Sequence, residues 1–344
     1  MVTPTRLFFI FSMILGTMIT LVSNHWFMAW IGLEINTLAF IPLIILKHHP
    51  RAIEAATKYF LTQAAASAVI LFSTFMNALT HGEWDISSLS PSMAIPVSLA
   101  LCMKLGIAPL HFWYTDILQG IPLVSGLVLS TWQKIAPLAL LIQISNSTNL
   151  MLMISMGMLS IMVGGWGGIN QVQLRKILAY SSIAHMGWML IILNFNMHLT
   201  LITFIIYLTL TSALFLNMMM LNMTTLTQFS TAWSKSPTLA LTTLLMILST
   251  AGMPPLTGFI PKLLISLELV KTSPLLVGTL FFISLLSMYF YLRLIYTIIL
   301  TVSPLTPPHT SIWRPAQKFL PLVALMNVLA IMLFSLTPTI LSTT

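Results

Sequence analysis

The chain has 344 residues, of which 58% are hydrophobic and 6% are charged, and its mean hydropathy is +0.98. This composition cannot form a water-soluble surface, so we expect an integral membrane protein whose main surroundings are the lipid bilayer. The formal net charge of +8 does not indicate nucleic-acid binding, because the basic residues are scattered singly. The only cysteine, Cys102, excludes an internal disulfide and a zinc or iron–sulfur site of four thiolates within this chain.

Apolar runs bounded by proline, glycine and polar clusters predict an all-α polytopic protein with about eleven membrane-spanning helices. The helices are expected near residues 2–22, 25–46, 53–79, 92–114, 122–144, 148–168, 172–194, 199–222, 237–271, 275–299 and 320–342. The first helix lacks a small-residue cleavage site and does not resemble an amphipathic presequence, so we expect it to be retained. One membrane domain accounts for the whole chain.

Eleven spans would place the two ends of the chain on opposite sides of the membrane. The side that holds the N-terminus, here called side A, would carry Arg6, Lys47, Arg51, Arg175, Lys176, Lys235, Arg314 and Lys318. The other side, side B, would carry Lys271 together with Glu83 and Asp85. Since loops rich in Lys and Arg stay on the cytoplasmic side of a membrane, side A is expected to be the cytoplasm, or the matrix if the membrane is mitochondrial.

Two of the predicted helices contain sequences that break a helix. The segment 237–271 would be about 52 Å long as one helix, against a hydrocarbon core of about 30 Å. Its stretch 252–258 (GMPPLTG) removes backbone donors and adds flexibility. The stretch 106–110 (GIAPL) in the fourth helix shares Gly, Pro and Leu with 252–256 at an offset of 146 residues. We therefore expect the fourth and ninth helices to be discontinuous.

The matching breaks favour two five-helix repeats, residues 1–145 and 146–300, followed by a loop and a last helix in 301–344. An odd number of helices per repeat inverts the second repeat in the membrane, as in many secondary transporters with broken helices. Three matching residues also arise by chance, so the sequence leaves the repeat open.

Four charged residues lie deep in otherwise apolar helices: Glu34, Lys104, Lys134 and Lys262. Each such charge costs about 2.5 to 3.5 kcal/mol at the centre of a membrane helix and is rarely kept without a function. Burial disfavours the charged form of an amine, which lets a lysine take up and release a proton. If Glu34 lay near Lys104 it would oppose this effect, so a separable pair could drive proton transfer. The structural alternative is that each lysine snorkels or binds carbonyl groups freed at a break.

Polar residues in the seventh helix offer a connection between the lysines. They are Tyr180, Ser181, Ser182 and His185. His185 is the main relay candidate, and interhelical hydrogen bonding is the alternative role of the whole segment. His111 and Thr257, which lie near the two breaks, have the same two interpretations.

Two further motifs are assigned no chemistry. The glycines of 164–168 (GGWGG) end a membrane helix and follow no strand, which indicates close helix packing or a turn rather than a phosphate loop. Arg51, Glu54 and Lys58 share one helix face near side A, and we expect a solvated charge cluster there.

Seven segments are specific enough to indicate a family. They are 25–36 (HWFMAWIGLEIN), 58–64 (KYFLTQA), 103–109 (MKLGIAP), 131–134 (TWQK), 164–170, 179–188 and 252–262. Along nearly its whole length the chain resembles the NADH dehydrogenase subunit 2 family, the mitochondrially encoded antiporter-like subunits of respiratory complex I. The form is similar to that of vertebrate members, which lack three N-terminal helices of bacterial relatives.

The resemblance implies a proton-translocating membrane-arm subunit of NADH:ubiquinone oxidoreductase. In such a subunit Glu34 and Lys104 would be a charge pair, Lys134 the central relay and Lys262 the exit-side lysine. The resemblance also implies the mitochondrial inner membrane, with the N-terminus in the matrix and the C-terminus in the intermembrane space. Partners would be other membrane-arm subunits, including neighbouring antiporter-like ones. NADH, FMN, iron–sulfur clusters and ubiquinone would bind other subunits, and this chain would bind no cofactor and no metal.

Two other functions are compatible with the same charges. A standalone cation/proton antiporter would use the same charge logic and would show sodium-dependent transport. A purely structural subunit would use the buried charges to hold its helices together and would be closed to water.

Overall fold

The computed structural model describes residues 4–45, 49–299 and 321–332. Lys47, Arg314, Lys318, the predicted loop after residue 300 and the end of the predicted helix 320–342 lie outside these residues. In the described parts the secondary structure is helical, apart from two isolated bridges that join His25 to Asp85 and Gln173 to Thr225. The chain divides into two compact units, Met1–Ser160 and Ile161–Thr344.

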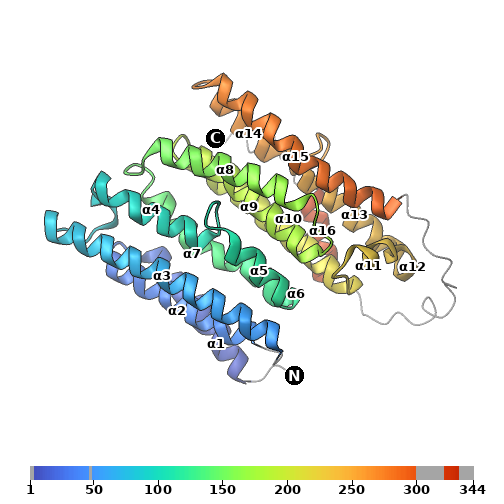
Figure 1. The fold of residues 1–344 in the computed structure, drawn as a ribbon, viewed down its shortest axis with the longest axis horizontal. Coiled ribbons are helices and arrows are strands. Elements are labelled where there is room, and N and C mark those ends of the chain that lie inside the picture. The colour runs from blue at the N-terminus through green and yellow to red at the C-terminus, as the bar shows by residue number, and fades with distance from the viewer. Residues whose placement is uncertain (1–3, 46–48, 300–320, 333–344) are drawn as a thin grey trace. The chain divides into compact units, whose positions relative to one another are not determined.

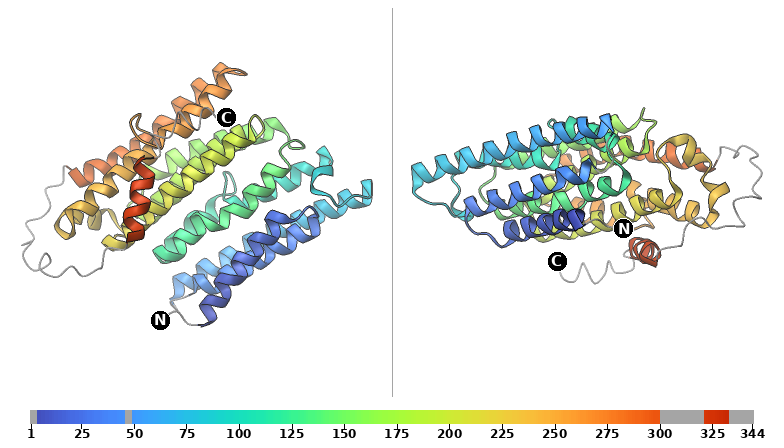
Figure 2. Two further views of the ribbon diagram at one scale, coloured as in Figure 1. Left: turned by 180° about the vertical axis from the view of Figure 1, so that it is seen from behind. Right: turned by 90° about the horizontal axis from the view of Figure 1, so that it is seen from below.

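The first unit is built around three long antiparallel helices that lie side by side (Figures 1 and 2). Its elements are α1 (Pro4–Val22), α2 (Trp26–Ile44), α3 (Pro50–His81), η1 (Ile86–Ser88), α4 (Pro91–Leu105), α5 (Phe112–Gly120), α6 (Leu123–Ser130), η2 (Trp132–Lys134) and α7 (Ile135–Gln143). Gly16 and Gly32 bring α1 and α2 close together, since a Cβ on either glycine would lie within 3 Å of the facing backbone. The helix α8 (Leu150–Gly168) leads into the second unit.

The second unit is organised around α9 and α10. Its elements after α8 are α9 (Leu174–Leu193), α10 (Met197–Leu221), α11 (Leu226–Ser230), α12 (Ala232–Lys235), α13 (Pro237–Ala251), α14 (Phe259–Val270), α15 (Pro274–Ile299) and α16 (Pro321–Met332). The apolar part of α9 is 83% buried, and α10 packs against α9, α13, α14 and α16. These two helices therefore form the core of the unit.

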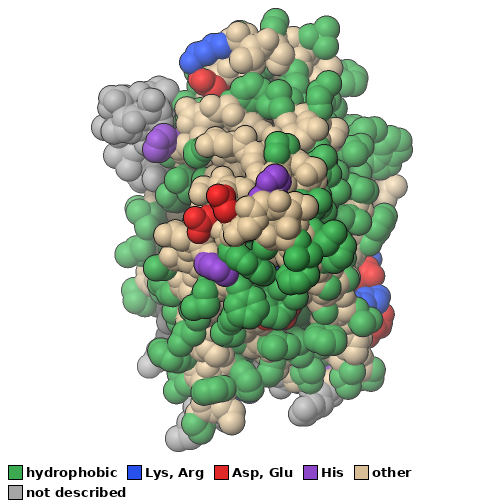
Figure 3. Space-filling model, turned by 90° about the vertical axis from the view of Figure 1, so that its left-hand side faces the viewer, with side chains coloured by type: hydrophobic (Ala, Val, Ile, Leu, Met, Phe, Trp, Pro, Cys, Tyr) green, Lys and Arg blue, Asp and Glu red, His purple; other side chains and the backbone are tan. Residues whose placement is uncertain are grey.

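The surface has the composition expected of a protein in a bilayer. Large apolar side chains point outward, and Leu275 is 81% exposed while Phe282 is 75% exposed. On the face shown in Figure 3, hydrophobic side chains cover much of the surface and charged side chains occur in a few small groups. Among the described residues, eight helical segments are long and apolar enough to cross a membrane by length and composition, and one of them, Leu123–Gln143, is interrupted. The count of eleven spans, the two inverted repeats and the boundaries at residues 145 and 300 stay predictions.

Both predicted helix breaks are present, and in each the first helix ends at a glycine in the left-handed conformation. α4 ends at Gly106 with φ +73°, and α13 ends at Gly252 with φ +84°. In each case the amide after the glycine donates to the carbonyl five residues before it, at 3.1 Å and 3.3 Å. This is the Schellman arrangement, which uses glycine because the left-handed conformation is strained for other residues. The broken fourth helix continues as α5 to Gly120, beyond the predicted end at residue 114.

The predicted helix over 122–144 is not continuous. It consists of α6, the single 3₁₀ turn η2 and α7, and the backbone leaves helical geometry at Thr131 with φ −112° and ψ −70°. The cause is Pro137, which has no amide proton to give to the carbonyl of Gln133 and whose ring crowds that carbonyl. The interruption sets Lys134 at a junction between helices rather than inside one.

Candidate functional site

The two lysines of the first unit lie at helix ends and are both buried. Lys104 occupies the last turn of α4 and is 5% exposed, and its Nζ donates to the carbonyl of Gln63 at 3.4 Å. Lys134 ends η2 and is 2% exposed, and its Nζ lies 4.7 Å from the centroid of the Tyr114 ring. Such a position over a ring face attracts the charged form of the amine.

Lys104 and Lys134 line the same cavity. It has a volume of about 10 Å³, which is roughly the room that the centre of one water molecule needs. The other lining residues are Tyr59, Gln63, Leu105, Trp113, Tyr114, Leu129 and Gln133. The fold thus gives two amines from different helices access to one small polar space.

A hydrogen-bonded chain of neutral side chains borders this cavity. Gln133 Nε2 donates to Asn36 Oδ1 at 3.1 Å, and the Tyr59 hydroxyl donates to Gln133 Oε1 at 3.4 Å. All three side chains are buried. The chain joins α2 and α3 to the turn that carries Lys134, and it fixes the orientation of the Gln133 amide beside the lysine.

Glu34 lies in electrostatic range of this site without touching Lys104. It sits half-buried on α2, and its Oε2 accepts from the Thr37 hydroxyl at 3.4 Å. In the part of the chain that the structure describes, no ion pair within 4.0 Å joins Glu34 to Lys104. The two charges are therefore separated in this conformation.

In the second unit, Lys262 lies against the end of the broken helix α13. Its Nζ donates to the carbonyl of Ala251 at 2.8 Å. A Cβ on Gly252 would lie 2.8 Å from the same Nζ. The carbonyls at a helix C-terminus carry partial negative charge, which stabilises the ammonium. The glycine thus serves both the left-handed backbone and the close approach of the lysine.

His185 and Lys262 line a second cavity of about 10 Å³, on α9 and α14. Tyr207 of α10 also lines it, and the Tyr207 ring centroid lies 5.8 Å from that of His185. Most of the remaining lining is apolar, including Trp188 and Ile265. The predicted relay histidine and the predicted exit lysine are thus brought to one site.

The other polar residues of the seventh predicted helix are held by local contacts. The hydroxyls of Ser181 and Ser182 donate at 2.7 Å to backbone carbonyls three residues earlier in α9. The ring of Tyr180 packs directly over Gly167, where a side chain would overlap it. Gly164 likewise lets α8 approach the backbone of α9. The prediction of close packing at the glycine run is confirmed.

The polar residues near the two breaks do not line these cavities. The Thr257 hydroxyl donates to the carbonyl of Ala330 in α16 at 2.6 Å. The Nδ1 atom of His111 lies 3.3 Å from the carbonyl of Pro109, within the first break. Both contacts favour a structural role over a relay.

The comparisons with known proteins agree along the whole chain. The family model described as NADH:quinone oxidoreductase/Mrp antiporter, TM, matches residues 23–287, and that described as NADH dehydrogenase subunit 2 C-terminus matches residues 288–341. The chain is 56% identical to NADH-ubiquinone oxidoreductase chain 2 of Aquarana catesbeiana, over 97% of each chain. It belongs to the NADH-ubiquinone oxidoreductase chain 2 family. The family comprises antiporter-like membrane-arm subunits of complex I.

Chains of two solved membrane complexes have the same fold. A chain of respiratory complex I from Thermus thermophilus superposes with a TM-score of 0.83 and 24% identity, covering 97% of this chain and 79% of that one. A chain of the Mrp complex from Dietzia sp. DQ12-45-1b gives 0.77 and 18% identity, covering 84% and 59%. The predicted antiporter-like fold is confirmed.

Sequence analysis of this chain 2 family member missed several residues of the site. Tyr59 and Gln63 line the lysine cavity and lie four residues apart on α3, a spacing that places two polar groups on one face of an apolar helix. That spacing could have identified Tyr59 and Gln63 as site residues from the sequence. Gln133 had only its position beside Lys134 to mark it. In the second unit, Tyr291 is buried and its hydroxyl interacts with Ser181 and Thr250, a contact that no local pattern indicates.

Proposed function

We propose that this chain moves protons across the mitochondrial inner membrane as a subunit of NADH:ubiquinone oxidoreductase, with Glu34, Lys104, Lys134 and Lys262 as its proton-carrying groups. The observation that carries the proposal is the cavity shared by Lys104 and Lys134. Two amines facing one space of single-water size can exchange a proton through that water or directly. Burial of both amines makes their neutral forms accessible, which a proton carrier requires.

Glu34 acts as the switch in this scheme. While its carboxylate is separated from Lys104, burial favours loss of the proton from the amine. When the carboxylate approaches, the ammonium form of Lys104 is favoured and the proton stays. In this scheme, a conformation without a direct ion pair between Glu34 and Lys104 is the one in which Lys104 gives its proton toward Lys134.

In the second unit, Lys262 is the exit-side amine and His185 its relay partner. Their common cavity supports this pairing, since an imidazole can accept a proton on one nitrogen and give one from the other. The carbonyl of Ala251 holds the ammonium until the proton leaves. Tyr180, Ser181 and Ser182 are secondary relay candidates, whereas the contacts of His111 and Thr257 favour a structural role for these two.

The scheme includes a defined orientation and set of partners. The N-terminus and side A face the matrix and the C-terminus faces the intermembrane space, which the basic loop residues Arg51, Arg175 and Lys176 support. The left-handed glycine at the start of each break supports two inverted five-helix repeats. Neighbouring antiporter-like subunits adjoin the chain, and NADH, FMN, iron–sulfur clusters and ubiquinone bind other subunits of the enzyme.

The test is the number of protons translocated per NADH oxidised by liposome-reconstituted complex that carries Lys134→Met. Methionine keeps the approximate length of the side chain and removes its charge. With assembly intact, we expect loss of proton translocation, or loss of turnover coupled to it. An unchanged proton ratio at unchanged turnover would make Lys134 structural and would refute the proposal.

A further inference from the structure

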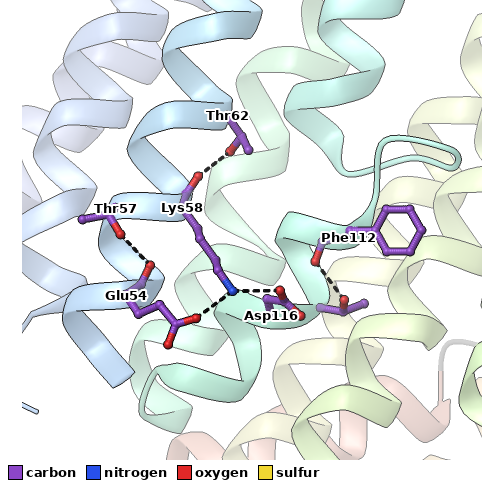
Figure 4. Close-up of polar contacts among 7 residues, drawn as sticks. Glu54, Thr57, Lys58, Thr62, Phe112 and Asp116 are labelled. Atoms are coloured by element: carbon purple, nitrogen blue, oxygen red, sulfur yellow. Dashed lines mark hydrogen bonds and ion pairs between the residues drawn. The ribbon is translucent and has the colours of Figure 1, made fainter. Parts of the chain in front are cut away.

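A charged groove lies at the side A end of α3 and α5. It has a volume of about 200 Å³ and is lined by Arg51, Glu54, Ala55, Lys58, Asp116, Gln119 and Gly120. The Lys58 ammonium is 2.8 Å from Glu54 Oε1 and 3.0 Å from Asp116 Oδ2. Figure 4 shows it between the two carboxylates, one from each helix. The cluster predicted for α3 is therefore completed by Asp116 of α5.

The groove and the lysine cavity follow the same seam between two antiparallel helices. Gly120 brings α5 against α3, since a Cβ there would lie 2.8 Å from the Arg51 carbonyl oxygen and 3.0 Å from Ala55 Cβ. Further along the seam the cavity is lined by Tyr59 of α3, four residues after Ala55, and by Trp113 of α5, seven residues before Gly120. The groove and the cavity thus come close in sequence on both helices, with Lys58 next to Tyr59 on α3 and Asp116 two residues after Tyr114 on α5.

Two aromatic side chains, Tyr59 and Trp113, line the cavity. The ring centroids of Tyr59 and Trp113 are 6.1 Å apart. The Tyr59 hydroxyl donates to Gln133 Oε1, and Gln133 directly precedes Lys134. Both rings line the cavity, and the Tyr59 hydroxyl thus contacts the residue next to Lys134 in sequence.

We propose that Glu54, Lys58 and Asp116 form the site at which the proton path takes up protons from water on side A. This inference rests on the proposed function and adds an entry point to it. A carboxylate of Asp116 or Glu54 accepts a proton from hydronium and becomes a carboxylic acid. It passes that proton by way of water and the Tyr59 hydroxyl to the neutral amine of Lys134, which becomes an ammonium, and the carboxylate is restored.

The bridging geometry suits such a site. Lys58 contacts both carboxylates, so protonation of one leaves the ammonium paired with the other. The side chains of Lys58, Glu54 and Asp116 are 41%, 63% and 46% exposed, so water reaches all three. Ion pairs with this exposure contribute little to stability, so their carboxylates can be neutralised in an assembled complex.

The experiment compares assembled, liposome-reconstituted complexes for proton translocation and NADH turnover. The decisive variant combines Glu54→Gln with Asp116→Asn, and its conservative partner combines Glu54→Asp with Asp116→Glu. Glu268→Gln is the matched control, because Glu268 forms an equally local ion pair with Lys271 at 2.6 Å in the other unit. Lys134→Met is measured in parallel to test the relay itself.

We expect the amide variant to lose most of its proton translocation and coupled turnover, and the conservative variant and Glu268→Gln to keep theirs. Added formate, a small proton carrier, should restore the amide variant, which a loss of structure would not permit. Full translocation by the amide variant, or an equal loss in the conservative variant without rescue by formate, would overturn the uptake site. If Lys134→Met alone abolishes translocation, the proposed function survives that result. Wild-type translocation by Lys134→Met would refute the proposed function instead.

Discussion

Lys104 and Lys134 come from different helices and face one buried cavity with room for about one water molecule. Two ammonium groups on the same small space repel each other, so a proton on one amine favours release from the other. On the proposed proton path, this arrangement would couple the protonation of the two lysines. Neither residue would have this property if the helix that contains Lys134 were continuous, because the 3₁₀ turn η2 sets its position.

Gln133 holds the polar chain beside the cavity. In Gln133→Leu, the side chains of Asn36 and Tyr59 lose their described partner. Each buried polar group left unsatisfied costs about 1 to 3 kcal/mol, so we expect a lower temperature of thermal inactivation for the assembled complex. Gln143→Leu is the matched control because Gln143 is exposed on α7. Equal inactivation temperatures for the two variants would contradict the structural role of the chain.

Two features require glycine at position 252. Its backbone is left-handed, and a Cβ there would lie against the Lys262 ammonium. In Gly252→Ala, the φ of +84° becomes strained by about 1 to 2 kcal/mol, and the new Cβ displaces the Lys262 ammonium from Ala251. We expect lower proton translocation per NADH oxidised. Gly278→Ala serves as control, since nothing lies within 4 Å of its added Cβ. A Gly252→Ala complex that translocates protons like the control would show that this lysine contact is dispensable.

Part of this fold could be predicted from the sequence, because some residues determine the backbone conformation locally. The glycines and prolines at 106–110 and 252–258 predict the two breaks, because each of these residues changes the backbone at its own position. Pro137 also indicates an interruption near Lys134. The segment is so apolar, however, that it resembles one continuous membrane helix. The shared cavities could not be predicted, because they depend on which faces of separate helices meet. Asp116 is an example, since its partner Lys58 lies on another helix.

A substitution of Thr257 distinguishes a structural role of its hydroxyl from a role as a proton relay. Its hydroxyl is bound to the carbonyl of Ala330, so Thr257→Val should lower stability by about 1 kcal/mol and leave the proton ratio unchanged. Thr257→Ser should keep both properties, and Thr279→Val controls for loss of an exposed threonine hydroxyl. Thermal inactivation and protons per NADH are measured on the same preparations. A lost proton ratio in a stable Thr257→Val complex would identify a relay.

Asn217 and Asn327 attach α16 to α10 through two reciprocal hydrogen bonds of 2.9 Å. Replacing either residue with leucine leaves the other amide buried without this partner, at a cost of about 1 to 3 kcal/mol. The double replacement removes both polar groups and should cost less than the sum of the single changes. Thermal inactivation of the three variants completes the cycle. Additive losses would mean that the two amides do not depend on each other.

The most direct measurement compares protons translocated per NADH oxidised by complexes that carry Lys104→Met, Lys134→Met and both changes. Because the two amines serve one cavity, we expect each single change to abolish translocation and the double change to add nothing. Assembly is checked in every preparation. Wild-type translocation by either single variant, with assembly and turnover intact, would contradict a proton path through this cavity.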